Sequence, residues 1–129
     1  MDKIIPGLFA ECTTTVTETL TASHLGSGTM AVYATPAMIA LMEMAARTAI
    51  DPLLEADQES VGTAVNIRHL AATPLGKPVR ARAEVTAIDG RQVTFTVEAW
   101  DEREKIGEGT HTRFVVDLTR FRTRLATKA

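Results

Sequence analysis

A helical stretch with almost no polar surface is the feature that most restricts how this chain can fold. Residues 32–46 read VYATPAMIALMEMAA and contain one charged side chain, that of Glu43. On a helical wheel, apolar side chains cover most of the circumference over residues 38–50, which is typical of a helix enclosed by other structure. Thr35 is a good N-cap residue and Pro36 suits the first helical position, so we predict that the helix begins at or next to Thr35.

Glu43, the single charge of residues 32–46, needs an explanation, because an unpaired carboxylate among methyl groups costs several kcal/mol. One interpretation is a polar stripe in which Glu43, Arg47 and Asp51, spaced by four residues, make ordinary salt bridges. The other is a functional carboxylate that faces a partner elsewhere in the fold. Residue spacing alone favours the stripe. We predict that the helix ends near residues 53–54, before the polar EADQES turn.

The rest of the chain has the composition and alternation of β-strands. Residues 12–20 combine threonine with valine, and four strand-like segments follow the helix. These segments are residues 62–73, 79–88, 92–100 and 109–119. Asp89-Gly90 is a tight hairpin signal between the second and third of them. The predicted order is one strand, one long helix and then an antiparallel meander.

A sheet with one apolar face and a helix with apolar surroundings can bury each other if the sheet curls around the helix. We therefore predict an α+β chain with the hotdog fold, a curved antiparallel sheet wrapped around one long central helix. We expect residues 1–129 to form a single domain. The curved sheet would keep an exposed edge strand, and pairing two sheets edge to edge removes it, so we expect a homodimer or a larger assembly.

Composition limits the remaining possibilities. A hydrophobic content of 45% in 129 residues can form a core without metals or disulfides. The single cysteine, Cys12, excludes an internal disulfide and fits a reducing compartment. The chain starts without the pattern of a signal peptide and its apolar run is too short to span a bilayer, so we expect a soluble, cytoplasmic protein without a membrane partner. A net charge of −2 with 5% aromatic residues argues against a nucleic-acid partner.

Three segments, in order along the chain, carry a resemblance to a known family. They read VYATPAMIALMEMAA, SVGTAVNIRHLAATPLG and IGEGTHTRFVVDL. Together they resemble the fluoroacetyl-CoA thioesterase-like family of hotdog thioesterases over about residues 32–118, with matching spacing of a Thr, a Glu and a His. The resemblance implies an acyl-CoA thioesterase with the catalytic residues Thr35, Glu43 and His69, and Gly62 also matches. It implies coenzyme A as part of the substrate and no separate cofactor.

Thioester hydrolysis asks for these residue types. It requires an oxygen nucleophile or an activated water, a group that moves its proton, and dipoles that face the developing oxyanion. Glu43 can fix the tautomer of His69 or act as base or nucleophile itself, and Thr35 lies beside the free N–H groups of the helix start. On one straight helix the Cα atoms of Thr35 and Glu43 are roughly 12 Å apart. They cannot touch directly unless Thr35 lies off the helix and folds back. The other possibilities are that His69 bridges them, or that the site combines Thr35 of one subunit with Glu43 or His69 of the other.

Further residues are candidates for binding the substrate. Tyr33, Met38 and Met42 are expected to form apolar walls of a cavity that the catalytic residues share, at or near the subunit interface. The basic C-terminal segment TRFRTRLATK has the composition of a solvated tail. Coenzyme A nevertheless brings phosphates that need cations, so Arg120 and Arg122 are candidates for binding them.

The other two histidines receive no catalytic role. His24 lies in a loop, and His111 is expected to point away from the face of Phe114, Val116 and Leu118. Both are predicted to be structural or solvated. One cysteine and three scattered histidines show no close-spaced metal motif, so no metal is expected.

Simpler interpretations exist for each candidate. A threonine before a proline is most often an N-cap, and a histidine on an apolar strand face is usually a satisfied core residue. The competing function is a non-catalytic hotdog dimer that binds an acyl-CoA or another small apolar ligand. The segment LGSGTMAVY offers only Tyr33 where the fluoroacetyl-specific enzyme has aromatic side chains. We therefore predict thioester hydrolysis, with an acyl pocket that is less closed than in the fluoroacetyl-specific enzyme.

Overall fold

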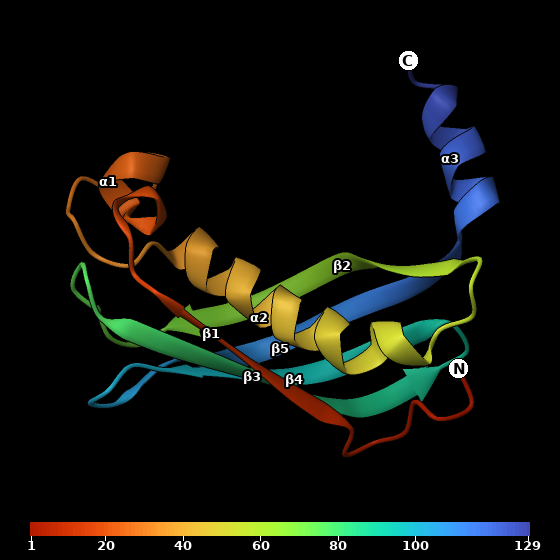
Figure 1. The fold of residues 1–129 in the computed structure, drawn as a ribbon, viewed down its shortest axis with the longest axis horizontal. Helices are drawn as coiled ribbons and strands as arrows, with labels where there is room; N and C mark the ends of the chain where they lie inside the picture. Colours follow the sequence, from red (N-terminus) through yellow and green to blue (C-terminus); the bar gives the residue numbers. More distant parts are fainter.

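A five-stranded antiparallel sheet curls around one long helix, α2, which spans Thr35–Ile50 (Figure 1). The computed structural model describes residues 1–129. The strands are β1 Phe9–Thr15, β2 Gln58–His69, β3 Pro78–Asp89, β4 Gln92–Trp100 and β5 Lys105–Asp117. The shorter helices are η1 Glu18–Leu20, α1 Ala22–Leu25, η2 Asp51–Leu53 and α3 Leu118–Ala126. The strand order is β1-β3-β4-β5-β2, and the predicted hotdog fold is confirmed.

The boundaries of α2 differ slightly from the prediction, and the difference matters for the site. Ala34 occupies the N-cap position in an extended conformation, so Thr35 and Pro36 are the first two helical residues. Thr35 is therefore not the N-cap, and its hydroxyl can bond elsewhere. At the other end, Pro52 lacks the N–H that would continue the helix, and α2 gives way to the 3₁₀ helix η2 after Ile50.

The core lies between α2 and the concave face of the sheet. Alternating side chains of β3 and β4 point towards the buried face of α2. These strand residues are Val79, Ala81, Ala83 and Val85 on β3 and Val93, Phe95, Val97 and Ala99 on β4. Gly107 of β5 leaves room for the helix, because a Cβ there would lie 2.5 Å from Sδ of Met38. The alternation seen in the sequence thus identifies the face that meets the helix in β3 and β4.

Strand β2 is one of the two edges of the sheet, since it pairs only with β5. A bulge between Gly62 and Ala64 interrupts this pairing, and all five residues over 62–66 are exposed. Val65 is 46% exposed although it pairs with His111, which faces the core. An unpaired edge that exposes an apolar side chain is suited to pairing with another chain.

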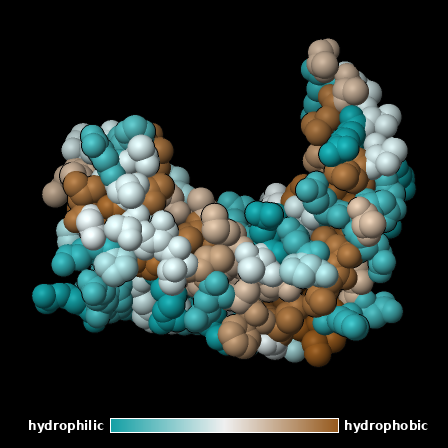
Figure 2. Space-filling view, in the orientation of Figure 1, coloured by the Kyte–Doolittle hydropathy of each residue, from teal (hydrophilic) through white to brown (hydrophobic).

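The C-terminal segment is a helix and not the solvated tail that its composition suggested. Helix α3 follows Asp117, whose Oδ1 accepts a hydrogen bond of 2.9 Å from the backbone N–H of Arg120. It projects away from the sheet (Figure 1), and in the space-filling view it forms one arm of a notch whose other arm is the region of α1 (Figure 2). No helix of the chain combines the length and apolarity needed to cross a membrane.

Candidate active site

Thr35 and His69 meet where the start of α2 lies against the end of β2, and we call them the Thr–His pair. Oγ1 of Thr35 lies 2.7 Å from Nδ1 of His69, a well-formed hydrogen bond. Burial lowers the pKa of His69, which favours a neutral imidazole at neutral pH. A neutral ring can accept the threonine proton at Nδ1, so the pair has the geometry of a hydroxyl beside its base.

Tyr33 packs against the ring of His69. The two rings meet edge to face with their centroids 6.5 Å apart. The hydroxyl of Tyr33 donates to the carbonyl of Ala37 at 3.3 Å, and burial raises the pKa of Tyr33 to about 12, so it remains protonated. Nε2 of His69 is buried and has no hydrogen-bond partner in the chain. Buried polar atoms are normally satisfied, so this nitrogen is free for a group that the single chain does not supply.

Glu43 lies further along α2 and faces the sheet at Gly62. Its side chain is 40% exposed, and its Oε2 lies 3.8 Å from Nη1 of Arg113 on β5. A Cβ at position 62 would approach this oxygen to 2.5 Å, so glycine lets β2 pass close to the carboxylate. The polar-stripe interpretation holds for Arg47, which bonds Asp51 at 3.0 Å, but Glu43 pairs across to the sheet instead.

Sequence reasoning missed two residues beside this carboxylate, His111 and Arg113. The sequence predicts a structural or solvated His111, but the solvated alternative is wrong, because only 1% of the residue is exposed. As predicted, His111 points to the other side of β5 from Phe114. The side that carries His111, however, is the one that faces α2. The pairing of β5 with β4 indicates that His111 is buried, since His111 lies directly across from the buried Phe95. We call Glu43, Gly62, His111 and Arg113 the glutamate cluster.

The structure brings the predicted residues together in two groups. No hydrogen bond or ion pair joins Glu43 to His69 within the chain, and eight residues of α2, roughly 12 Å of rise, separate Thr35 from Glu43. The predicted walls Met38 and Met42 are fully buried on this stretch of helix. The single chain therefore lacks the predicted arrangement in which His69 bridges Thr35 and Glu43. It also lacks the one in which Thr35 lies off the helix and folds back, because Thr35 is the first residue of α2.

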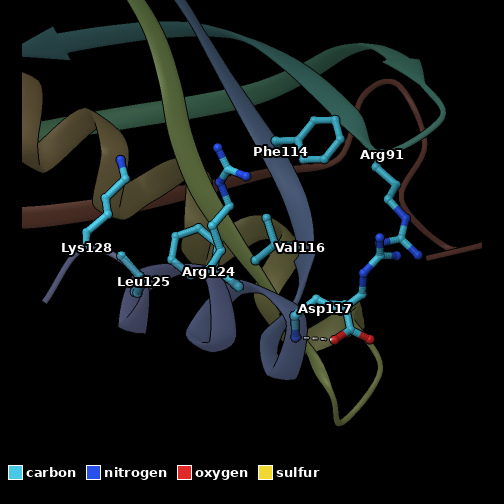
Figure 3. A pocket seen from close by; sticks show the side chains of 9 residues that line it. Arg91, Phe114, Val116, Asp117, Arg124, Leu125 and Lys128 are labelled. Carbon is cyan, nitrogen blue, oxygen red and sulfur yellow. Dashed lines mark hydrogen bonds between the residues drawn. The ribbon is translucent and has the colours of Figure 1, made fainter.

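A hollow of about 680 Å³ lies between α3 and the outer face of β5 (Figure 3), and no residue of the Thr–His pair or the glutamate cluster lines it. Its lining mixes apolar and cationic side chains and consists of Arg91, Phe114, Val116, Asp117, Arg120, Phe121, Arg124, Leu125 and Lys128. Of the two predicted coenzyme A ligands, Arg120 lines this α3 hollow and Arg122 does not. The length of β2, roughly 35 Å for its 12 residues, separates α3 from His69 of the same chain.

The curled antiparallel sheet and the long helix that it encloses define the hotdog fold. Comparison with known proteins gives the family. The model of the family described as fluoroacetyl-CoA-specific thioesterase matches residues 16–119. This chain belongs to that family and is a thioester hydrolase.

Individual relatives agree with this assignment. The fluoroacetyl-CoA thioesterase of Streptantibioticus cattleyicolor is 41% identical over 97 residues, which is 75% of this chain and 70% of that protein. A solved structure of the fluoroacetyl-CoA thioesterase FlK has a TM-score of 0.93 and 34% identity, covering 99% of both chains. A point mutant of FlK in complex with acetyl-CoA has a TM-score of 0.92 and 34% identity, covering 97% of this chain and 98% of that one.

Proposed function

We propose that this chain hydrolyses small acyl-CoA thioesters to the free acid and coenzyme A, with Thr35, His69 and Glu43 as catalytic residues. The observation that carries the proposal is the 2.7 Å hydrogen bond between Thr35 and His69, next to an imidazole nitrogen without a protein partner. A hydroxyl beside an imidazole is suited to acyl transfer. The relatives named for fluoroacetyl-CoA and the complex with acetyl-CoA support a small acyl group.

Each residue has a role that its position allows. Thr35 begins α2, where backbone N–H groups lack intrahelical partners and favour the negative charge that develops on the thioester oxygen. His69, kept neutral by its lowered pKa, accepts a proton from the attacking oxygen and returns it to the departing thiolate. Glu43 supplies the carboxylate that acts as base or nucleophile. Water supplies the oxygen of the product acid, either by attacking the thioester directly or by cleaving an acyl-enzyme formed on Thr35 or Glu43. In both cases a C–O bond forms, the C–S bond breaks, the proton removed from the attacking oxygen goes to the thiolate, and the products are the acid and the thiol.

The two groups become one site if two chains pair through β2, and we propose such a homodimer. Pairing two copies of an edge strand about a two-fold axis makes them antiparallel, so the Gln58 end of one lies beside the His69 end of the other. Gly62 of one chain, and Glu43 with it, then approaches the Thr–His pair of the second chain. The exposed run over residues 62–66 supports β2 as the strand that pairs.

The same pairing gives the α3 hollow a role in binding coenzyme A. It brings the hollow of one chain towards the His69 end of the other, and phosphates bind to clustered cations. We propose that Arg120 and the other cations of the hollow bind the phosphates of the substrate, and that Arg122, which does not line it, contributes less. A cytoplasmic location fits this substrate and the half-buried free thiol of Cys12.

Free-thiol release over a panel of acyl-CoAs of increasing chain length, with fluoroacetyl-CoA included, tests the proposed function. We expect turnover of the short acyl groups. The preference for fluoroacetyl over acetyl should be modest, because Tyr33 is the single aromatic residue of residues 25–33, the segment in which the fluoroacetyl-specific enzyme has several. The matched control is Glu43→Gln, which should bind the same acyl-CoAs and turn them over poorly. Binding without turnover across the panel would favour a non-catalytic acyl-CoA binder, and a monomer by light scattering would contradict the dimer.

A further inference from the structure

His111 is the buried titratable residue that the mechanism above leaves unused. We propose that His111 is a positioning residue, which accepts a hydrogen bond from Arg113 and thereby keeps the Glu43 carboxylate free for the reaction. This inference rests on the proposed function, because it assumes that Glu43 takes part in hydrolysis. It concerns contacts within one chain and does not depend on how two chains pair.

The two polar contacts of His111 determine its tautomer. Nδ1 lies 2.9 Å from the carbonyl oxygen of Ala64, which can only accept, so Nδ1 carries the proton. Nε2 lies 3.2 Å from Nη1 of Arg113, which can only donate, so Nε2 is the acceptor. The ring also stacks on Phe95, with centroids 6.0 Å apart and 24° between the planes. His111 is thus neutral, fixed in orientation, and engaged with the arginine through its one acceptor.

Arg113 has five N–H donors, and three of them are engaged by groups that fix its position. Nε and Nη2 donate to Oγ and the carbonyl oxygen of Ser60 at 2.9 and 3.0 Å, and Nη1 donates to His111. Ser60 donates in turn to Oδ1 of Asp51 at 2.8 Å, which anchors the guanidinium to the end of the central helix. This leaves Glu43 3.8 Å from Nη1, an ion pair without a hydrogen bond.

Loss of the acceptor on His111 would therefore change the state of Glu43. A buried donor without a partner costs about 1–3 kcal/mol, so Nη1 of Arg113 would move to another acceptor. The Glu43 carboxylate, already within ion-pair distance, is available for it. A direct, charge-assisted hydrogen bond between the two would hold the carboxylate against the sheet and weaken it as base or nucleophile.

The same histidine stabilises the stretch of β2 that passes the carboxylate. Its partner Ala64 borders the bulge, and Gly62 lies on the other side of the bulge. A Cβ at Gly62 would meet Oε2 of Glu43, Cε1 of His111 and Nη1 of Arg113 at 2.5, 3.2 and 3.4 Å, so the three side chains converge there. His111 therefore connects the strand, the guanidinium and the carboxylate at one place.

Protonation would abolish this arrangement. A proton on Nε2 of His111 removes the acceptor and places a second cation beside Arg113. Burial lowers the pKa of His111, so the neutral acceptor is the form present at neutral pH. The charge of Arg113 also lowers the pKa of His111, and the charge of Glu43, the acid that faces the ring, raises it. We expect His111 to contribute to the loss of kcat at acidic pH.

Two conservative variants separate the donor of the ring from its acceptor. His111→Gln places an amide oxygen near the position of Nε2, where it can accept from Arg113, and His111→Asn places an amide N–H near the position of Nδ1, where it can donate to Ala64. We expect His111→Gln to keep most of kcat and to lose part of the acid limb of the pH profile. We expect His111→Asn to lower kcat by roughly 10–100-fold with little change in KM.

His24→Asn is the matched control, because it makes the same substitution at an exposed histidine, and it should leave kcat and the pH profile unchanged. The side-chain Nη1–H resonance of Arg113 in NMR spectra supplies a measurement that does not need turnover, because Nη1 is the atom that donates to His111, and it should shift in His111→Asn and persist in His111→Gln. A wild-type protein inactive on every acyl-CoA would refute the proposed function while leaving this resonance as a test of the contact. Equal kcat values in the two His111 variants, with the Arg113 resonance unchanged in both, would overturn the positioning role.

Discussion

Replacing Gly62 with alanine should separate catalysis from stability, because the added methyl group meets the Glu43 carboxylate. The Cβ would lie 2.5 Å from Oε2, whereas an ordinary contact begins near 3.4 Å. The oxygen must therefore move by roughly 1 Å, and a misplacement of this size costs on the order of 10²-fold in rate. We expect kcat of Gly62→Ala to fall by about this factor in a free-thiol release assay.

The backbone should tolerate the same change. Gly62 does not have a positive φ, and alanine is favoured over glycine inside a strand by about 0.5–1 kcal/mol. The oxygen that must give way is at the end of a flexible and partly exposed side chain. The melting temperature measured by thermal denaturation should therefore stay constant or rise slightly while kcat falls.

The contrasting substitution is Gly107→Ala, at a glycine of the neighbouring strand. Its Cβ would lie 2.5 Å from Sδ of Met38 and 3.2 Å from Cε of Met42, inside the core. Overpacking of this kind costs typically about 1–3 kcal/mol, so this variant should lose melting temperature. Wild-type kcat in Gly62→Ala, in a protein with confirmed turnover, would refute the placement of Glu43 in the site.

Other substitutions and pH test the remaining roles. Glu43→Gln keeps the shape and removes the charge, so steady-state kcat should fall by roughly 10²–10⁴-fold; a small drop in melting temperature alone would leave Glu43 a salt-bridge partner. Thr35→Ser keeps the hydroxyl and should be mild, and His69→Ala should lower kcat more than it raises KM. Burial lowers the pKa of His69 and of His111 in the folded state, so the folded chain binds fewer protons than the unfolded chain. The two neutral imidazoles therefore contribute fully to the free energy of unfolding above about pH 6.5, and this contribution is lost as the pH falls below that value. A melting temperature that rises when the pH is lowered from 7 to 5 would contradict this.

The central helix and the strands could be predicted because their signals are local. An apolar helix with one carboxylate and a Thr-Pro start differs from any surface helix, and β3 and β4 alternate in step with their burial. The N-cap was misplaced by one residue, because Ala34 takes the cap position without a side-chain hydrogen bond. That shift frees the Thr35 hydroxyl for His69, a contact across 34 residues of sequence that no local pattern contains.

The glutamate cluster could not be predicted from alternation. Both faces of β5 carry large side chains, and the apolar Phe114 and Val116 lie on the outer face while His111 and Arg113 face the helix. The apolar side chains therefore indicated the wrong face of β5 as the buried one, because the face that meets the core carries the polar residues His111 and Arg113. Helix α3 was missed for another reason, since a nine-residue segment rich in arginine is marginal as an isolated helix and depends on its Asp117 cap.

Mixed dimers test most directly whether one chain supplies Glu43 and the other supplies Thr35 and His69. A dimer of a Glu43→Gln chain with a His69→Ala chain would contain one site with both substitutions and one with neither. It should recover about half of wild-type activity although each parent homodimer has little. A dimer of Thr35→Ala and His69→Ala chains should recover none, because these hydrogen-bonded residues come from one chain and both sites are damaged. With each chain carrying a different tag and the dimers purified through both, no recovery in the first dimer would contradict the shared site.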